Sequence, residues 1–161
     1  MAGNDITTGT LNTLIGALAG DKLTAASSNT AVGYNSLSTD VLGALSTAVG
    51  RDALKSQNFT TATNSHNTAD GYIASGAITT EIQNTFIVTS DGDALTDADY
   101  NTAVGYIALS SDTLGSASTA IGFRALNAQN FTTATNSHNT AVGYQAGNVL
   151  TTGVQNTFIG S

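Results

Sequence analysis

The chain has 161 residues, of which only 9% are charged, and its formal net charge is −7 at pH 7. Typical soluble domains carry about 25% charged residues. Small residues take their place here, and these suit tight turns and thin layers better than a bulky core. The four basic residues are scattered, which excludes a phosphate-binding patch for nucleic acid and disfavours contact with anionic membranes.

Residues 1–11 precede the repetitive part of the chain. They contain no basic residue and no apolar core of signal-peptide length, so we expect no classical secretion signal. No apolar run in the sequence approaches the roughly 18 residues that cross a bilayer, so we expect no membrane insertion. We interpret 1–11 as an N-terminal attachment or cap segment and 12–161 as one repeat domain.

From residue 12 onward, a six-residue motif recurs. Its full form, Asn-Thr-Ala-Val-Gly-Tyr, begins at Asn29, Asn101 and Asn139. Looser copies begin at residues 12, 46, 67, 84, 118 and 156. Successive copies begin 17 residues apart, except that the steps from 46 to 67 and from 118 to 139 are longer by four residues. Self-similarity at a short period indicates a stack of structural repeats.

A longer period is superimposed on the short one. Every motif start in the first long unit (12–83) recurs in the second (84–155), and a partial third unit occupies 156–161. Residues 57–69 recur unchanged at 129–141. The long unit is therefore a duplicated block of four short repeats.

The short step decides the fold class. A step of 17 residues, or of four more in the longer coils, is too short for a helix pair or a propeller blade. Within the motif, Thr, Val and Tyr alternate with Ala and Gly, which is the period of a β-strand, and the surrounding Asn, Gly and Ser favour turns. The sequence predicts an all-β protein, a parallel β-solenoid (β-roll) of stacked 17–21-residue coils.

Stacking aligns equivalent residues in columns. We expect the fourth motif position to form the buried ladder of the solenoid, with Asp70 as its one exception among Ile15, Val32, Val49, Ile87, Val104, Ile121, Val142 and Ile159. Glycine at the fifth position predicts a positive φ or a close backbone approach between chains. The opening Asn or Ser predicts an Asx-type turn or a side-chain ladder between coils. The sixth position predicts an aromatic stack, exposed or packed between subunits, formed by Tyr34, Arg51, Tyr72, Tyr106, Phe123 and Tyr144.

One apolar ladder would stabilise each coil only weakly. A buried Val or Ile contributes about 1.5–3 kcal/mol, whereas ordering a residue costs about 1–2 kcal/mol, and each coil has at least 17 residues. We therefore expect a second face to be buried by self-association around a threefold axis, where each coil meets its copies at the same height. On this ground we predict a homotrimer.

Five segments resemble repeats of known families: TAVGYNSL (30–37), TAVGRDAL (47–54), TAVGYIAL (102–109), TAIGFRAL (119–126) and TAVGYQAG (140–147). They are similar to the head repeats of trimeric autotransporter adhesins and to repeats of bacteriophage fibre and head-decoration proteins. The resemblance implies a trimeric, left-handed parallel β-roll. The coil is longer than the usual adhesin coil, and the signal peptide, coiled-coil stalk and membrane barrel of an autotransporter have no counterpart in this sequence. We therefore expect a virion protein rather than an adhesin.

His66 and His138 are the only histidines and occupy equivalent places in the two long units. Three copies of either could bind an ion on a threefold axis. Alternatively, both lie in a turn and were carried along by the duplication. The absence of a second ligand at metal spacing favours the turn.

An acidic cluster comprises Asp91, Asp93, Asp97 and Asp99. Oxygen-rich loops of this kind can bind Ca²⁺. The spacing matches neither the EF-hand loop nor the RTX nonapeptide, so a solvated turn is the favoured interpretation.

The two longer coils each add four residues, within 57–66 and 129–138. Loops inserted on one face of a repeat protein often carry binding contacts, which makes Phe59, His66, Phe131 and His138 candidates for binding. The alternative, which we prefer for the two phenylalanines, is that they fill the core under the loop.

No nucleophile elbow, zinc-protease motif, phosphate loop or dinucleotide fingerprint is present, so we predict no enzymatic activity, no cofactor and no metal. The main hypothesis is a structural protein of a virion surface: a head-decoration or cement protein, a fibre or a tail appendage, in contact with capsid or tail proteins of the same particle. The alternative is an adhesin or receptor-binding head on a bacterial cell surface that recognises a glycan or protein of a host. An ice-binding solenoid is the third hypothesis. It would need two parallel rows of threonine side chains on one flat face, and the motif supplies one row.

Overall fold

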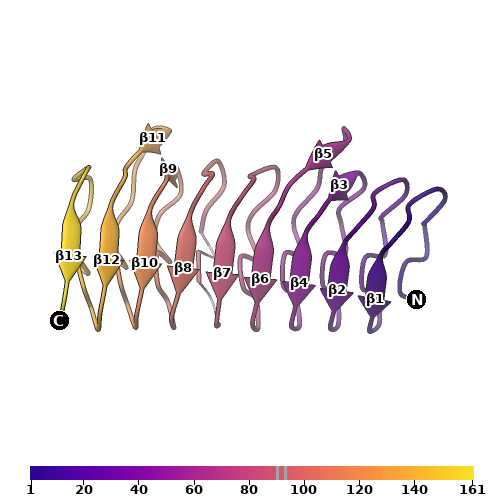
Figure 1. Cartoon of the computed structure of the whole chain (residues 1–161), viewed down its shortest axis with the longest axis horizontal. Coiled ribbons are helices and arrows are strands. Elements are labelled where there is room, and N and C mark those ends of the chain that lie inside the picture. The colour runs from indigo at the N-terminus through magenta and orange to yellow at the C-terminus, as the bar shows by residue number, and fades with distance from the viewer. Residues whose placement is uncertain (90, 93) are drawn as a thin grey trace.

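The computed structural model describes residues 1–89, 91–92 and 94–161, which form a stack of coils (Figure 1). These residues contain thirteen short β-strands and no helix. The motif strands are β1 (Thr13–Ile15), β2 (Thr30–Val32), β4 (Thr47–Val49), β6 (Thr68–Asp70), β7 (Thr85–Ile87), β8 (Thr102–Val104), β10 (Thr119–Ile121), β12 (Thr140–Val142) and β13 (Thr157–Ile159). The others are β3 (Gly43–Ala44), β5 (Thr63–Asn64), β9 (Gly115–Ser116) and β11 (Thr135–Asn136). The prediction of an all-β solenoid of stacked coils is confirmed.

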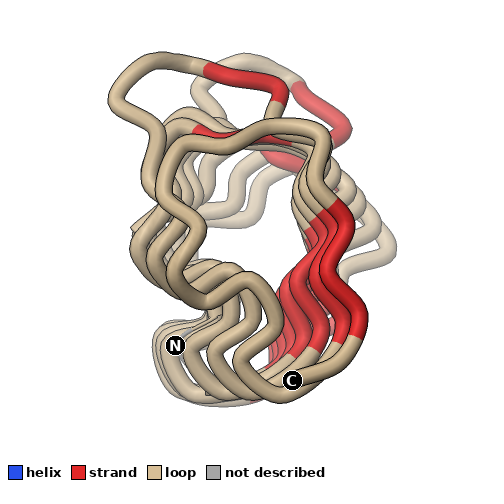
Figure 2. Tube along the Cα trace, turned by 90° about the vertical axis from the view of Figure 1, so that its left-hand side faces the viewer, coloured by secondary structure: helices blue, strands red, loops and turns tan. Residues whose placement is uncertain are grey.

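The motif strands form one long parallel sheet. Its order is β1-β2-β4-β6-β7-β8-β10-β12-β13, so each strand pairs with the strand one coil away. The register aligns equivalent residues, as in Thr13 with Thr30. The longer coils keep this register, since Thr47 pairs with Thr68, and their additional residues bulge out elsewhere. Figure 2 shows the motif strands of successive coils aligned along one wall.

The third motif position lines the interior of the coils, and we call it the alanine column. It holds Leu14, Ala31, Ala48, Ala69, Phe86, Ala103, Ala120, Ala141 and Phe158. Its six alanines and Phe86 are fully buried. They belong to one core cluster with fully buried leucines from the following turn, such as Leu37 and Leu109.

The expectation that the fourth motif position forms the buried ladder is wrong. These side chains point out of the coil and are partly or largely exposed; Ile15 is 59% exposed and Ile121 39%. The affected residues are Ile15, Val32, Val49, Ile87, Val104, Ile121, Val142 and Ile159. Strand alternation places neighbouring side chains on opposite faces but does not specify which face turns inward. Buried leucines of the following turn, such as Leu37, share the interior with the small alanines, and the β-branched residues lie outside.

Where a large side chain occupies the alanine column, a glycine makes room for it. A Cβ atom at Gly20 would lie 2.8 Å from Leu14 Cδ2, and one at Gly147 would lie 2.9 Å from Phe158 Cδ2. A Cβ atom at Gly92 would overlap the Phe86 ring. The paired exchange keeps the coil at constant size, because protein interiors are close-packed and tolerate little added volume.

The glycine at the fifth motif position adopts a positive φ in every copy, between 118° for Gly160 and 148° for Gly71, and Val88 takes its place with φ 99°. The predicted positive φ is confirmed. The structure shows a close approach between successive coils of one chain, not the predicted approach between chains, since a Cβ atom at Gly105 would lie 2.6 Å from the carbonyl oxygen of Gly122. Non-glycine residues with positive φ turn the other corners of the coil, for example Asn35 and Leu37.

Two smaller sheets mark the longer coils. Strand β5 pairs with β3, and β11 pairs with β9, in the same relation one long unit later. Strands β5 and β11 lie in the protruding loops at the top of Figure 1, and β3 and β9 lie on the preceding coils. The loops therefore protrude from a different side of the coil than the long sheet, as the view along the stack shows (Figure 2).

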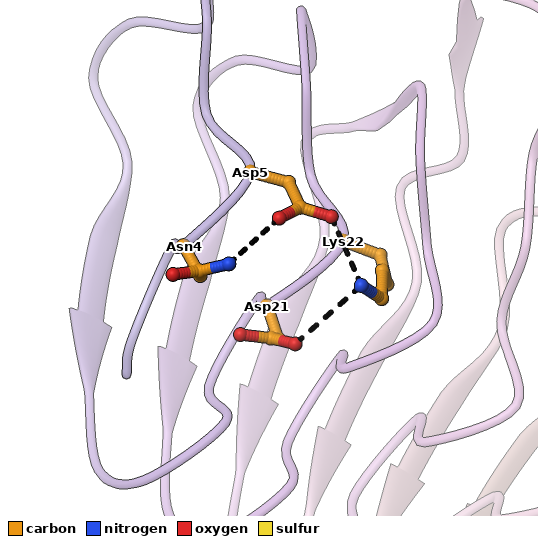
Figure 3. A network of polar contacts seen from close by, with 4 residues as sticks. All are labelled: Asn4, Asp5, Asp21 and Lys22. Atoms are coloured by element: carbon orange, nitrogen blue, oxygen red, sulfur yellow. Dashed lines mark hydrogen bonds and ion pairs between the residues drawn. The ribbon is translucent and has the colours of Figure 1, made fainter.

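The N-terminal segment continues the stack. The backbone N–H of Gly3 donates to the carbonyl of Ala19 at 2.9 Å, and that of Asp5 donates to Asp21 at 3.1 Å. Lys22 Nζ also lies 3.0 Å from Asp5 Oδ2 (Figure 3). This hydrogen-bonded pair lowers the pKa of Asp5 and raises that of Lys22. Because both groups are exposed to solvent, the pair stabilises the segment only slightly.

Substitution of Gly105 by alanine tests the close stacking at the glycine column. Gly105 combines φ +138° with backbone contact to the next coil, whereas Gly160 has φ +118° and no neighbouring atom within 4 Å. We expect Gly160→Ala to cost about 1–3 kcal/mol through backbone strain alone. Gly105→Ala should cost several kcal/mol more, because the coils must also separate. Urea denaturation measures both, and equal losses would contradict this account of coil spacing.

Candidate interaction surface

The outer side of the long sheet carries two parallel columns. The threonine column is the second motif position, and the valine column is the fourth; the structure describes every residue of both. Asp70 is the only charged residue in either column. Several aliphatic side chains are well exposed, with Ile87 at 37% and Ile159 at 81%. An extended apolar surface of this kind is typical of an interaction site.

An aromatic column runs beside the valine column, two residues further along each coil. The Tyr106 and Phe123 rings stack with centroids 6.0 Å apart, and Phe123 stacks on Tyr144 at 5.2 Å with an interplanar angle of 9°. These rings are exposed, Tyr144 by 59%. The predicted aromatic stack is confirmed within one chain. We call the threonine, valine and aromatic columns together the outer face.

In the first long unit, an arginine interrupts the aromatic column. The Arg51 guanidinium lies 5.7 Å from the centroids of both the Tyr34 and the Tyr72 rings. This geometry permits a cation–π interaction with each ring. Its Nε also lies 3.0 Å from Asp52 Oδ2. The planar guanidinium of Arg51 therefore continues the stack between the two tyrosine rings.

The opening asparagines of the motif hold the coils in register behind this face. Asn101 is fully buried. Its Nδ2 donates to the carbonyl of Gly115 at 2.9 Å within its own coil, and its Oδ1 accepts the N–H of Ser118, one coil on, at 2.8 Å. Asn29 makes the same pair of bonds to Gly43 and Ser46. The predicted side-chain ladder is confirmed, and it satisfies backbone groups that the turns leave unpaired.

Two coils open with serine instead of asparagine, and a buried glutamine completes the ladder there. Gln57 Nε2 donates to Asp40 Oδ2 at 2.6 Å and to Ser46 Oγ at 3.0 Å, while its Oε1 accepts from Asn67 Nδ2 at 2.9 Å. Asp40 Oδ1 also accepts the N–H of Phe59 at 2.9 Å. The second long unit repeats this network with Asp112, Ser118, Gln129, Phe131 and Asn139.

This network was not predicted from the sequence, although a signal for it exists. Serine opens the motif only at Ser46 and Ser118, and a glutamine follows eleven residues later in the same two coils. Those are also the two longer coils. The buried hydrogen bonds around Gln57 and Gln129 therefore hold the base of each protruding loop in place.

The candidate binding loops present different residues than expected. Phe59 and Phe131 are only 4% and 5% exposed and lie under the loops. Their burial confirms the interpretation that we preferred from the sequence, and it leaves neither side chain available as a binding contact. His66 and His138 are exposed and occupy turns with φ 52° and 51°. The remaining exposed side chains of these loops include Thr60 and its equivalent Thr132.

The acidic cluster divides between two environments. Asp91 is fully buried, and its carboxylate accepts the N–H of Gly105 at 3.1 Å and of Ala108 at 3.2 Å. A solvated turn is therefore wrong for Asp91. Asp97 is exposed, and Asp99 Oδ1 accepts the N–H of Ile82 at 2.8 Å. Asp93 lies outside the described residues.

Among the residues that the structure describes, no group of three or more His, Asp or Glu side chains is arranged to hold a metal ion. The same part of the chain contains no helix long and apolar enough to cross a membrane. No protein-family model matches the sequence, and the comparisons with curated proteins and with solved structures likewise gave no match.

Removal of one ladder asparagine tests its contribution. Asn101→Ala leaves the carbonyl of Gly115 and the N–H of Ser118 without their side-chain partners. We expect a loss of about 2–4 kcal/mol in unfolding free energy, because both groups are buried. Asn156→Ala is the matched control, since Asn156 is partly exposed in the last coil, and it should cost about 1 kcal/mol or less. Similar losses in chemical denaturation would show that the ladder contributes little.

We expect Glu81 to make the stability of the chain depend on pH. Its side chain is 2% exposed, and burial raises its pKa above the ordinary value of 4.5 despite a hydrogen bond from the Thr79 N–H. A raised pKa in the folded state favours the protonated form, so this stability is present below the unfolded pKa and is lost as pH rises through the folded pKa. Glu81→Gln should therefore be more stable than the natural protein at pH 7. The difference should disappear near pH 4 in urea denaturation; a constant difference would exclude this titration.

Proposed function

We propose that this chain is a structural protein of a virus particle surface, built as a rigid homotrimer around the outer face. The single observation that supports it best is that face: Asp70 and Arg51 are the only charged residues in its three columns. Burying such a surface would add to the stabilisation that the core of one chain supplies. The proposed roles are head decoration or cement, a fibre, or a tail appendage.

A threefold assembly fits the two unlike columns of the outer face. In a cyclic trimer, one surface of each copy contacts a different surface of the next. The valine column of one copy would then pack against the aromatic column of its neighbour. Because both columns advance by one residue per coil, the contact would repeat at every level of the stack.

The interior supports a mechanical role over a catalytic one. The asparagine ladder and the glutamine networks bond successive coils along most of the stack. Such pairing resists local opening and proteolysis. The resemblance of the TAVGY segments to phage fibre and decoration repeats supports placement on a virion, and we propose no enzymatic activity for this chain.

An adhesin or receptor-binding head is the second candidate. The observation that favours it is the pair of identical protruding loops, at 57–66 and 129–138, which expose threonine and histidine side chains at two levels of one rod. Two identical contacts on one rigid body raise the affinity for a repetitive surface glycan. Antibodies against the chain distinguish the candidates, because they should label purified virus particles in electron microscopy; labelling confined to bacterial cells would support the adhesin.

The oligomeric state tests the proposed assembly directly. Light scattering of the purified chain should give three times the chain mass of 16.2 kDa. Phe123→Glu places a charge in the centre of the aromatic stack and should weaken association by at least roughly 10-fold. Thr60→Glu, on an exposed loop outside the outer face, is the control and should leave the trimer intact. A monomeric natural chain would refute the assembly.

A further inference from the structure

The outer face contains one acidic and one basic residue, and they lie on successive coils. Asp70 occupies the valine column on β6, and Arg51 occupies the aromatic column of the preceding coil, which contains β4. Adjacent parallel strands are about 4.7–4.9 Å apart. The two charges are therefore offset by a single step along the rod.

Neither charge is fully satisfied within the described part of the chain. The side chain of Asp70 is exposed and has no hydrogen bond or ion pair to any described residue. Arg51 is 62% exposed in its side chain and uses Nε for Asp52, which also accepts from Asn35 Nδ2 at 2.7 Å. The terminal guanidinium nitrogens of Arg51 make no further polar contact among the described residues. Stacking between Tyr34 and Tyr72 holds the guanidinium on the outer face.

Neither charge is present at the equivalent position of the second long unit. One long unit after Arg51 stands Phe123, and one long unit after Asp70 stands Val142. The second unit therefore has an aromatic and an aliphatic residue at the places where the first has a cation and an anion. Asp52, which contacts Arg51 within the chain, is replaced at the same step by Arg124, so the second unit lacks both the own-chain partner of Arg51 and the equivalent of Asp70.

We propose that Arg51 of one copy pairs with Asp70 of the next copy in the homotrimer, and that these pairs fix the axial register between copies. The inference rests on the proposed function, since it needs the outer face to be buried between copies. Apolar columns that repeat at every coil would also allow neighbouring chains to associate one coil out of step with little change in contact, and such an offset gives an open helical assembly in place of the closed trimer. One charge pair per interface prevents this, because a slipped register buries both charges without partners.

Charge reversal tests the pair through the stability of the trimer. Asp70→Lys and Arg51→Asp should each weaken association by roughly 30-fold or more, measured by sedimentation. The double variant, which restores an opposite pair, should recover most of the loss. As a control, Asp5→Asn, which disrupts an exposed ion pair outside the outer face, should have no effect on association.

Cysteine crosslinking tests the contact itself, because the natural chain contains no cysteine. Arg51→Cys chains with a size tag are refolded together with untagged Asp70→Cys chains and mildly oxidised. A disulfide-linked band of mixed mass is expected, since this bond can form only between copies. Phe123→Cys with Val142→Cys should crosslink equally, because these are the equivalent positions one long unit later. Arg51→Cys with Lys22→Cys should not.

The outcomes separate the two proposals. A monomeric natural chain overturns the trimer and the pair together. A natural trimer in which the double reversal gives no recovery and the mixed band is absent overturns the pair and leaves the trimer standing. Recovery by the double variant together with the mixed band supports both.

Discussion

Everything in this fold depends on one constraint: each residue must pair with its equivalent one coil away. The backbone of the long sheet meets it through parallel strands in which Thr pairs with Thr and Ala with Ala. The asparagine ladder meets it through side chains, because one amide bonds its own coil and the next. A substitution that disturbs one coil therefore affects both neighbours, which explains why the motif varies so little along the chain.

The two longer coils show how the pairing of equivalent residues is maintained where the sequence departs from the repeat. The coils that begin at Ser46 and Ser118 are four residues longer and lack the asparagine. A glutamine from the same coil reaches the vacant place and bonds Asp40 or Asp112 in the preceding coil. The four added residues lie in the protruding loops that contain β5 and β11. For this reason β4 still pairs in register with β6, and β10 with β12. The loops can vary in length because the polar core beneath them maintains the register.

The repeats of the sequence were sufficient to predict the fold, but not the inward face. Equivalent residues at a fixed step require stacked coils, and the short step excludes helices, so the solenoid, the glycine turns and the asparagine ladder could all be predicted. The choice between alanine and valine as the core residue could not, since a two-residue period is the same from both sides of a strand. Hydrophobicity favoured valine, whereas the size of the coil interior, known only from the three-dimensional structure, favours alanine. The buried carboxylates of Asp40 and Asp91 were missed for a related reason: their partners lie on the next coil, 17 residues away.

The apolar side chains that remain outside the coils link stability to assembly. In most domains the large aliphatic and aromatic side chains are buried by folding; here Phe86 and leucines such as Leu37 are buried, but many Ile, Val and Tyr side chains remain on the outer face. Hydrogen-bonded ladders contribute only modestly to net stability, because the unfolded chain bonds to water instead. Many of the exposed large apolar side chains, such as Ile15, Tyr106 and Tyr144, lie on the outer face. In the proposed trimer, burial of this face between copies therefore adds to the stability that the interior of one chain supplies, and a stiff rod and a stable assembly follow from the same columns.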